Sequence, residues 1–457
     1  MKNFTSFLFL LLLAQPSFAQ WEASTIGFDD PLNIWSMDAV DADVAWAITT
    51  DGTYSGDVWA ISTSKTFART ADGGATWKKG EVPLPSNSYG LWKVSAVDAN
   101  TAWVAASNPF TLGAAIFKTA DGGDTWTQQD VFSSASFCTV IHFWDTENGI
   151  AIGDPLNNVY EIYSTNDGGE TWEAVGPENI PAPQFSWEYV STSVCSVVED
   201  HIWFGTYGSR VFHSADRGLT WTASETPIAS ITSNPWVEGL TFSDELKGIA
   251  YSADYSAPPY QHLIALTEDG GATWVEQAVE DSDFAIFKAQ YIAGTNLLIK
   301  TSRASNGNGP YATSISYNNG ISWTDIETST PIADFEFIDQ ATAWAGKFKN
   351  NDEPTAMYKF TGDALTGLFV PQPLEAELKV GPNPVIDEVA VEIRTQEESQ
   401  LTLRLFAANG RLILQRQLDE AQFFNEVLAL GDLPRGTYTL SMENAKGEQL
   451  SRQLIKQ

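Results

Sequence analysis

The sequence has little cysteine, histidine and basic residue, and each shortage narrows what the chain can do. Its 457 residues include two cysteines and four histidines. A disulfide framework or a histidine-based metal centre needs more such residues than this. Lysine and arginine number 25 against 58 aspartates and glutamates. Because binding to phosphate requires cations, nucleic acid and anionic membranes are excluded as partners.

The two cysteines, Cys138 and Cys195, leave two interpretations open. In an oxidising compartment they can form one disulfide, and as buried free thiols they behave as small hydrophobic side chains. The sequence does not choose, since a bridge depends on the separation of the Cα atoms. The histidines are scattered, so we predict no metal site and no cofactor. Asp281-Ser282-Asp283 is the only calcium candidate, and two acids are few for that ion.

Long apolar runs are scarce as well. The run Phe7–Ala14 follows Met1-Lys2 and precedes Ser17-Phe18-Ala19. A positive start, a short apolar core and a small-x-small end are typical of a cleavable secretory signal, which we assign to residues 1–20. No later run reaches the roughly 18 apolar residues of a membrane-spanning helix. We therefore expect an exported protein with no membrane span.

One motif recurs throughout the first 370 residues. It reads 70-TADGGATW-77, 119-TADGGDTW-126, 165-TNDGGETW-172, 214-SADRGLTW-221, 267-TEDGGATW-274 and, in a decayed form, 316-SYNNGISW-323. Its acidic position steps through Asp72, Asp121, Asp167, Asp216, Asp269 and Asn318, at intervals of 49, 46, 49, 53 and 49 residues. A period of this size indicates one supersecondary unit repeated around a single architecture.

Each copy of the motif is readable as a tight turn. Its Asp offers acceptors to local backbone N–H groups, and the glycines tolerate the positive φ angles of a hairpin connection. Its last residue opens the next strand with a large apolar ring suited to packing. These rings belong to Trp77, Trp126, Trp172, Trp221, Trp274 and Trp323. We assign the motif a structural role.

A second element shows that there are seven units. Upstream of each turn, a short polar segment separates two apolar runs, as in 40-VDADVAWAI-48, and seven such hairpins can be counted. The seventh motif is expected at residues 360–367, where no Trp strand follows. Trp21-Glu22-Ala23-Ser24 reads like the segment after each motif. We therefore expect the N-terminal strand to complete the seventh unit and protect its edge.

These repeats resemble Asp-box (BNR-type) repeats, which are found in sialidases, xyloglucanases, sortilin-type receptors and propellers similar to the photosystem II assembly factor. The resemblance implies an all-β fold with a seven-bladed β-propeller over residues 21–366. It also implies that the boxes lie on the rim away from the ligand face, which disfavours catalysis by Asp72 or its equivalents. It does not imply a photosynthetic role, because nothing in this chain pairs with a photosynthetic partner.

The chain changes character near residue 370. Residues 367–377 read as an extended linker, and residues 378–457 as a compact β module with a strand pair over 401–418. This tail resembles the type A C-terminal sorting domain of the type IX secretion system. The resemblance is carried by Pro382, Asn383, Pro384, Asn409, Gly410, Gly436, Tyr438 and Lys456. It implies a small Ig-like β-sandwich that engages the secretion machinery. Export then runs through the periplasm to the cell surface or the medium. The alternative is an unrelated Ig-like binding module.

The ligand face of such propellers lies at the loops between second and third strands and at the crossovers between blades. The loops there are long or aromatic in this chain. Our candidates for ligand binding are Tyr54, Trp59, Trp92, Trp187, Trp236, Tyr255, Tyr260 and Arg303. The tryptophans at the starts of inner strands have a second interpretation, which is packing between blades. We favour a secreted adhesion-type module that binds glycan or protein.

An enzyme is the alternative. Sialidase chemistry needs three arginines that converge on a carboxylate. This propeller has four, Arg69, Arg210, Arg217 and Arg303, and the positions of Arg69 and Arg217 in or beside boxes argue against that chemistry. An extracellular glycoside hydrolase with a carboxylate pair in the channel mouth stays open. Its candidate acids are Glu188, Glu238 and Asp254.

Overall fold

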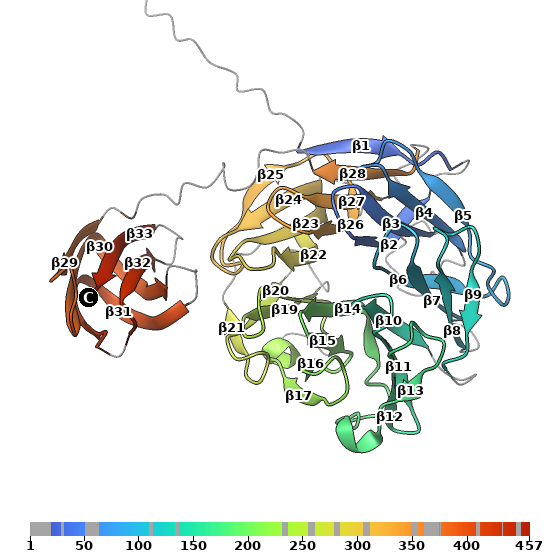
Figure 1. Ribbon diagram of the computed structural model, residues 1–457, viewed down its shortest axis with the longest axis horizontal. Coiled ribbons are helices and arrows are strands. Elements are labelled where there is room, and N and C mark those ends of the chain that lie inside the picture. Colours follow the sequence, from blue (N-terminus) through green and yellow to red (C-terminus); the bar gives the residue numbers. More distant parts are fainter. Residues whose placement is uncertain are drawn as a thin grey trace, which may run out of the picture.

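Strands dominate this chain and form eight separate sheets among the described residues (Figure 1). The structure, a computed structural model, describes residues 20–28, 32–50, 64–108, 113–132, 137–230, 236–254, 261–277, 284–304, 311–348, 354–360, 374, 376–407, 412–431, 433–444 and 449–457. The only helical elements in these ranges are two short 3₁₀ turns, η1 (Pro177–Asn179) and η2 (Pro227–Ser230). The expected all-β fold is confirmed.

Seven of the sheets have four antiparallel strands and form the blades of a propeller. Blade 1 consists of β2 (Asn33–Ala39), β3 (Val44–Thr50), β4 (Thr66–Ala71) and β5 (Lys78–Glu81). Blade 2 consists of β6 (Gly90–Ala96), β7 (Ala102–Ser107), β8 (Ala114–Thr119) and β9 (Thr127–Gln129). Blade 3 consists of β10 (Cys138–Phe143), β11 (Gly149–Leu156), β12 (Val159–Thr165) and β13 (Glu173–Ala174).

The next three blades repeat this order from the inner to the outer strand. Blade 4 consists of β14 (Val190–Val198), β15 (His201–Thr206), β16 (Arg210–Ser214) and β17 (Thr222–Glu225). Blade 5 consists of β18 (Gly239–Phe242), β19 (Gly248–Asp254), β20 (Gln261–Thr267) and β21 (Val275–Gln277). Blade 6 consists of β22 (Phe284–Tyr291), β23 (Leu298–Ala304), β24 (Tyr311–Ser316) and β25 (Thr324–Glu327).

Blade 7 is assembled from both ends of the propeller sequence. Its strands are β26 (Ile332–Phe337), β27 (Ala343–Lys347), β28 (Ala356–Phe360) and, at the outer edge, β1 (Trp21–Thr25). Trp21 lies opposite Phe360 in the ladder and is 4% exposed. Its ring packs edge-on against Phe337 and Phe360, with centroids 5.8 and 5.3 Å away. The N-terminal strand thus closes the ring, as the sequence predicts.

The Asp boxes form the turns between third and fourth strands. In blade 3, Asp167 Oδ1 accepts from Thr171 N at 2.9 Å and Oδ2 accepts from Thr171 Oγ1 at 2.6 Å. Gly168 and Gly169 have φ angles of 71° and 85°, so a side chain there would strain the backbone. The same bonds recur at Asp72, Asp121, Asp216 and Asp269. Each turn is therefore held by contacts within its own blade.

The inner strands are joined by a second, less visible repeat. In six blades, the residues at one equivalent register position of the inner strand share a role. The side chain of each accepts a hydrogen bond from a backbone N–H group of the inner strand in the next blade. The acceptors and donors are Asp38 and Ala96, Ser95 and Phe143, Ser196 and Phe242, Thr241 and Tyr291, Gln290 and Phe337, and Glu336 and Ala39, at 2.8–3.1 Å. In blade 3 the equivalent residue is His142, for which the described structure shows no such bond. We call this set the inner ring.

The C-terminal sheet has five strands. They are β29 (Ala376–Gly381), β30 (Glu388–Ala407), β31 (Leu412–Ala429), β32 (Gly436–Asn444) and β33 (Gln449–Lys456). The first half of β30 pairs with β29 and its second half with β32. β31 pairs with both halves, and this pairing shifts register between Arg394 and Leu401. Side chains from both halves, among them Val391 and Leu403, are buried in one core. The two halves therefore enclose a single sandwich core.

Candidate functional site

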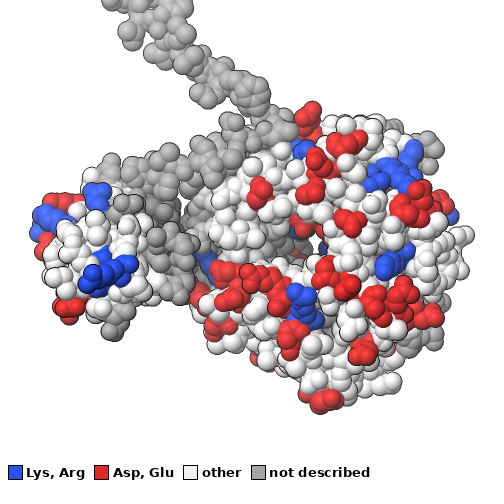
Figure 2. All heavy atoms as spheres, viewed as in Figure 1, with Lys and Arg blue, Asp and Glu red and all other residues white. Residues whose placement is uncertain are grey.

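The two faces of the propeller are formed by different turns and loops. First-to-second hairpins and Asp boxes lie at one end of the blades, so second-to-third loops and crossovers lie at the other. We call this second end the channel-mouth face. Figure 2 shows one face of the ring, where acidic side chains gather around the central hollow and outnumber basic ones. Across residues 21–370 there are 45 acidic and 15 basic residues.

The channel-mouth face carries exposed aromatic rings. Trp187 and Tyr189, in the crossover into blade 4, are 48% and 42% exposed, and Trp35 of β2 is 37% exposed. Phe185 lies against Trp187 with ring centroids 4.0 Å apart. Trp92 is only 8% exposed and packs edge-on against Trp35. The aromatic candidates thus divide into a packed residue, Trp92, and an exposed one, Trp187.

Glu188 is a structural acid. It is completely buried and forms an ion pair with Arg210, whose Nε and Nη2 donate to Oε1 and Oε2 at 2.6 Å each. Thr206 Oγ1 and Gln184 N donate to the same two oxygens at 3.1 and 2.6 Å. Four donors fill the acceptor positions of a carboxylate, so Glu188 has none left for substrate.

The other two catalytic candidates lie in blade 5. Glu238 Oε1 accepts from Trp236 Nε1 at 2.7 Å, just before β18. Asp254 is the last residue of β19 and lies opposite Gln261 in the ladder. Candidates Tyr54, Trp59, Tyr255 and Tyr260 lie outside the described residues, as do Asp281–Asp283. Arg303 lies in β23, opposite Tyr311.

Three carboxyl groups near the channel have raised pKa values. Burial, and then the negative charge of Asp38, raises the pKa of Glu336 to about 7. Burial also raises the pKa of Asp38. At the channel-mouth end of β11, burial raises the pKa of Asp154 to about 7, although Val190 N donates to its Oδ1 at 2.9 Å. Each of the three acids accepts a backbone hydrogen bond, so each contributes to the packing of the inner strands and crossovers.

The arginines do not form a sialidase triad in the described structure. Arg69 donates to Ala99 O, Arg210 to Glu188, and Arg217 to Asp200. The cysteines are both free, and burial raises the pKa of the Cys195 thiol to about 12. No group of three or more His, Cys, Asp or Glu suited to a metal ion occurs among the described residues.

Residues expected to mark the sorting module hold its ends together. Asn383 Oδ1 accepts from Ile455 N at 2.9 Å, and Val385, just past Pro384, bridges to Lys456. Tyr438 is buried and its hydroxyl donates to Pro434 O at 2.8 Å. Pro382 precedes this contact, Gly436 starts β32, and Asn409 and Gly410 lie outside the described residues.

Two family models match this chain. Residues 379–457 match the secretion system C-terminal sorting domain, and residues 32–182 match photosynthesis system II assembly factor YCF48. The chain joins a YCF48-like propeller to a type IX sorting domain. It is therefore secreted to the cell surface or the extracellular space through the secretion machinery that reads this domain. No helix among the described residues is long and apolar enough to cross a membrane.

Solved structures agree on the propeller fold. YCF48 bound to D1 peptide is 17% identical over 76% of this chain and 98% of its own, with a TM-score of 0.53. YCF48 from Cyanidioschyzon merolae is 13% identical over 75% of this chain and 99% of its own, with a TM-score of 0.51. Identities this low establish the fold alone. No curated protein matches the chain.

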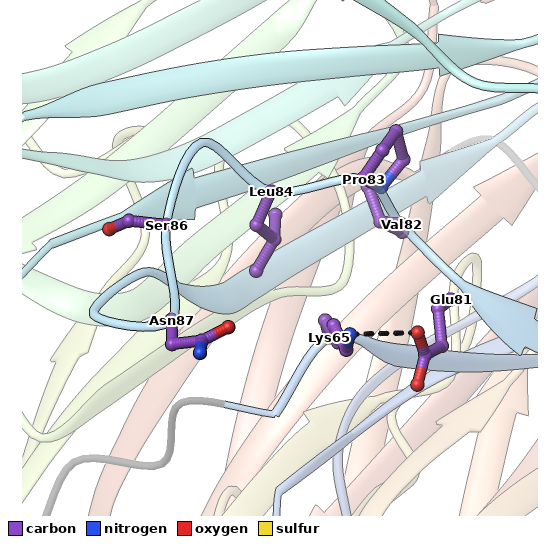
Figure 3. Close-up of a pocket in the computed structure, with 7 residues that line it drawn as sticks. All are labelled: Lys65, Glu81, Val82, Pro83, Leu84, Ser86 and Asn87. Atoms are coloured by element: carbon purple, nitrogen blue, oxygen red, sulfur yellow. Dashed lines mark ion pairs between the residues drawn. The ribbon is translucent and has the colours of Figure 1, made fainter.

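The YCF48-like propeller also has a pocket of about 380 Å³ at the crossover from blade 1 to blade 2 (Figure 3). Its walls include Leu84 and an ion pair of 2.8 Å between Lys65 and Glu81. Both ion-pair partners are about half exposed, so the pair contributes little stability. The pocket lacks an aromatic or an unpaired charge, and we assign it no role.

Sequence reasoning missed Tyr189 and the inner-ring acids. Tyr189 directly follows the candidates Trp187 and Glu188 in the sequence. Its exposure depends on the path of the crossover into blade 4. Asp38 and Glu336 belong to hairpins whose sequences differ, so only the strand register makes them equivalent.

Proposed function

We propose that the secreted propeller is a binding module of the adhesion type, which takes a glycan or protein ligand on its channel-mouth face. The observation that carries this proposal is the exposed pair Trp187 and Tyr189, backed by Phe185. Aromatic rings give a large contact area at low entropic cost, and they dominate binding energy at interfaces. YCF48 bound to D1 peptide is a precedent for a peptide ligand on this fold.

The hydrolase alternative has weaker support. It needs two carboxyl groups roughly 5–10 Å apart that are available to a sugar. Glu188 has no acceptor position left, and Asp38 and Glu336 each already accept a backbone N–H of the next blade. Binding without turnover requires only a contact surface for the ligand, and the exposed aromatic rings provide one.

The test is a binding and turnover screen of the purified chain, residues 21–457, against polysaccharides and glycoproteins. We expect saturable binding without product. Changing Trp187→Ala and Tyr189→Ala together is expected to weaken binding about tenfold or more. Phe423→Ala is the matched control, because that ring is also 48% exposed but lies in the sorting domain. Product formation, or unchanged affinity in the double variant, contradicts the proposal.

A further inference from the structure

The crossover from blade 3 to blade 4 is fixed in place by hydrogen bonds. Glu188 N donates to Phe185 O at 3.1 Å and closes a tight turn. The Glu188 carboxylate accepts from Gln184 N at 2.6 Å, and Arg210 Nη2 donates to Ala182 O at 3.0 Å, which joins the crossover to β16. The exposed rings of the proposed binding face therefore lie on a segment that is ordered before a ligand arrives, which lowers the entropic cost of binding.

The turn between β15 and β16 lies against these rings. Gly208 is in this turn, and a Cβ atom there would come within 2.7 Å of Phe185 Cζ and 3.0 Å of Glu188 Cγ. Phe185 also contacts Trp187, with ring centroids 4.0 Å apart and ring planes inclined by 39°. A side chain at position 208 would displace the Phe185 ring and, with it, the support of Trp187. We call Phe185 and Trp187 the aromatic platform.

Polar atoms lie next to the aromatic platform. Gln184 directly precedes Phe185, and its Nε2 donates to Glu225 Oε1 at 3.1 Å; both side chains are exposed. Within the described part of the chain, neither Gln184 Oε1 nor Glu225 Oε2 takes part in a further hydrogen bond. Both oxygens can accept from hydroxyl groups. An exposed ring with acceptors beside it suits a ligand that has an apolar face and many hydroxyls.

Charge narrows the ligand further. Residues 21–370 contain 45 acidic and 15 basic residues. Arg210, which contacts this crossover, is 7% exposed and is paired with Glu188. The negative field of the propeller repels the carboxylate and sulfate groups of anionic glycans. An uncharged sugar chain meets no such repulsion.

We infer that the aromatic platform binds neutral glycans, with Trp187 stacked on a pyranose ring and Gln184 and Glu225 accepting from its hydroxyls. The CH groups on a sugar face are weakly positive and match the negative face of an indole. Recognition of a peptide by strand addition needs a free strand edge, and residues 181–189 form no strand. The inference rests on the proposed binding function and narrows its ligand to an uncharged polysaccharide.

The test is native electrophoresis of the purified chain, residues 21–457, in gels that contain a soluble polysaccharide. The neutral gels contain hydroxyethylcellulose, galactomannan, dextran or glycogen, and the anionic gels contain carboxymethylcellulose, polygalacturonate or alginate. Hydroxyethylcellulose and carboxymethylcellulose share a backbone and differ in charge, so they form a matched pair. We expect at least one neutral polysaccharide to retard the chain, and the anionic ones to leave its migration unchanged. Retardation in no gel, or in the anionic gels as strongly as in the neutral ones, overturns the inference.

Variants locate the site on the polysaccharide that retards the chain most. We expect Trp187→Ala to weaken binding at least about tenfold, and Gly208→Ala, which displaces Phe185 without removing a ring, at least about threefold. Gly381→Ala is the matched control, because a Cβ atom there meets nothing within 4 Å. Thermal melts show which variants stay folded, and Phe185→Leu tests the same contact if Gly208→Ala does not.

Native affinity in Trp187→Ala, or in the folded variant of the Gly208 contact, overturns the assignment to the aromatic platform. A different result separates this inference from the proposed function. If no polysaccharide binds, but Trp187→Ala still weakens a protein ligand from the screen, the proposed function survives that failure.

Discussion

On the Asp-box face, Asp121 and Asp167 accept hydrogen bonds from their own turns, whereas on the inner ring Asp38 and Glu336 accept them from a neighbouring blade. Asp121 is exposed and Asp167 is partly exposed, and hydrogen bonds from Thr125 and Thr171 lower their pKa values to about 2. The inner-ring acids Asp38 and Glu336 are half-buried along the inner strands, and burial raises their pKa values. A carboxylate thus stabilises the turn of an Asp box at little cost in desolvation. On the inner ring, a carboxylate is ionised only at a desolvation cost.

The two regions therefore respond to pH in opposite directions. The box aspartates stabilise the folded state above their ordinary pKa of 3.8, and this stabilisation is lost as the pH falls toward 2. Glu336, with an ordinary pKa of 4.5, and Asp154 hold protons up to about pH 7 when folded. Between those limits the unfolded chain binds fewer protons, so stability falls as the pH rises through this window. We expect greatest stability in mildly acidic solution.

The largest expected effect comes from a buried acid that does have a counter-ion. Glu188→Ala leaves Arg210 buried and unpaired, and we expect a loss of about 3–5 kcal/mol in the free energy of unfolding. Urea titration monitored by tryptophan fluorescence measures it. Replacing Glu188 and Arg210 together by Met restores most of the loss, since no uncompensated charge remains. Equal stability of Glu188→Ala and the native chain contradicts a structural role for the pair.

A smaller effect of opposite sign is expected at the inner ring. Glu336→Gln keeps an acceptor for Ala39 N but removes the buried charge, so it stabilises the propeller at pH 8 by about 1 kcal/mol. At pH 5 the native Glu336 is already protonated and the gain disappears. Urea midpoints of both proteins at the two pH values provide the measurement. A gain that is the same at both values shows that charge is not its cause.

The smallest effect is expected at the rim. Asp167→Asn keeps the acceptor for Thr171 N and loses one charged acceptor for its hydroxyl, so the melting temperature at pH 7 falls only slightly. Blade 6 shows that the turn tolerates this change, because Asn318 Oδ1 accepts from Ser322 N at 3.0 Å there. Thermal melts at pH 7 and near pH 3 test this, because the variant is expected to lose less stability in acid. A loss in acid as large as in the native chain is the contrary outcome.

These two regions also differ in how far the sequence predicts them. The boxes are read directly, because turn geometry requires Asp and Gly at fixed spacing. The closure by Trp21 follows from the same pattern. The inner ring uses Asp, Ser, Thr, Gln and Glu interchangeably, since only an acceptor at one register position is needed. Such a set has no residue signature and appears only when strand pairing is known.

The site and the tail were partly predictable for similar reasons. Trp187 stands out in the sequence as an aromatic before an inner strand, but the exposure of Tyr189 beside it depends on the path of the crossover into blade 4. In the tail, a strand pair was expected over 401–418, whereas β30 and β31 extend to Glu388 and Ala429. Exposed Phe423 and Val427 break the apolar alternation there and conceal the second half of β31.

The closure of blade 7 sets the order in which the chain folds. β1 is made first, and its partner β28 is the last strand of the propeller to be made. Contacts this distant in sequence form slowly, because a long loop must be ordered before they add stability. Blades 1 to 6 can form in sequence before β1 pairs with β28 to complete blade 7. We therefore expect a late, single kinetic step that joins Trp21 to Phe360, after which the ring opens only when most of it unfolds.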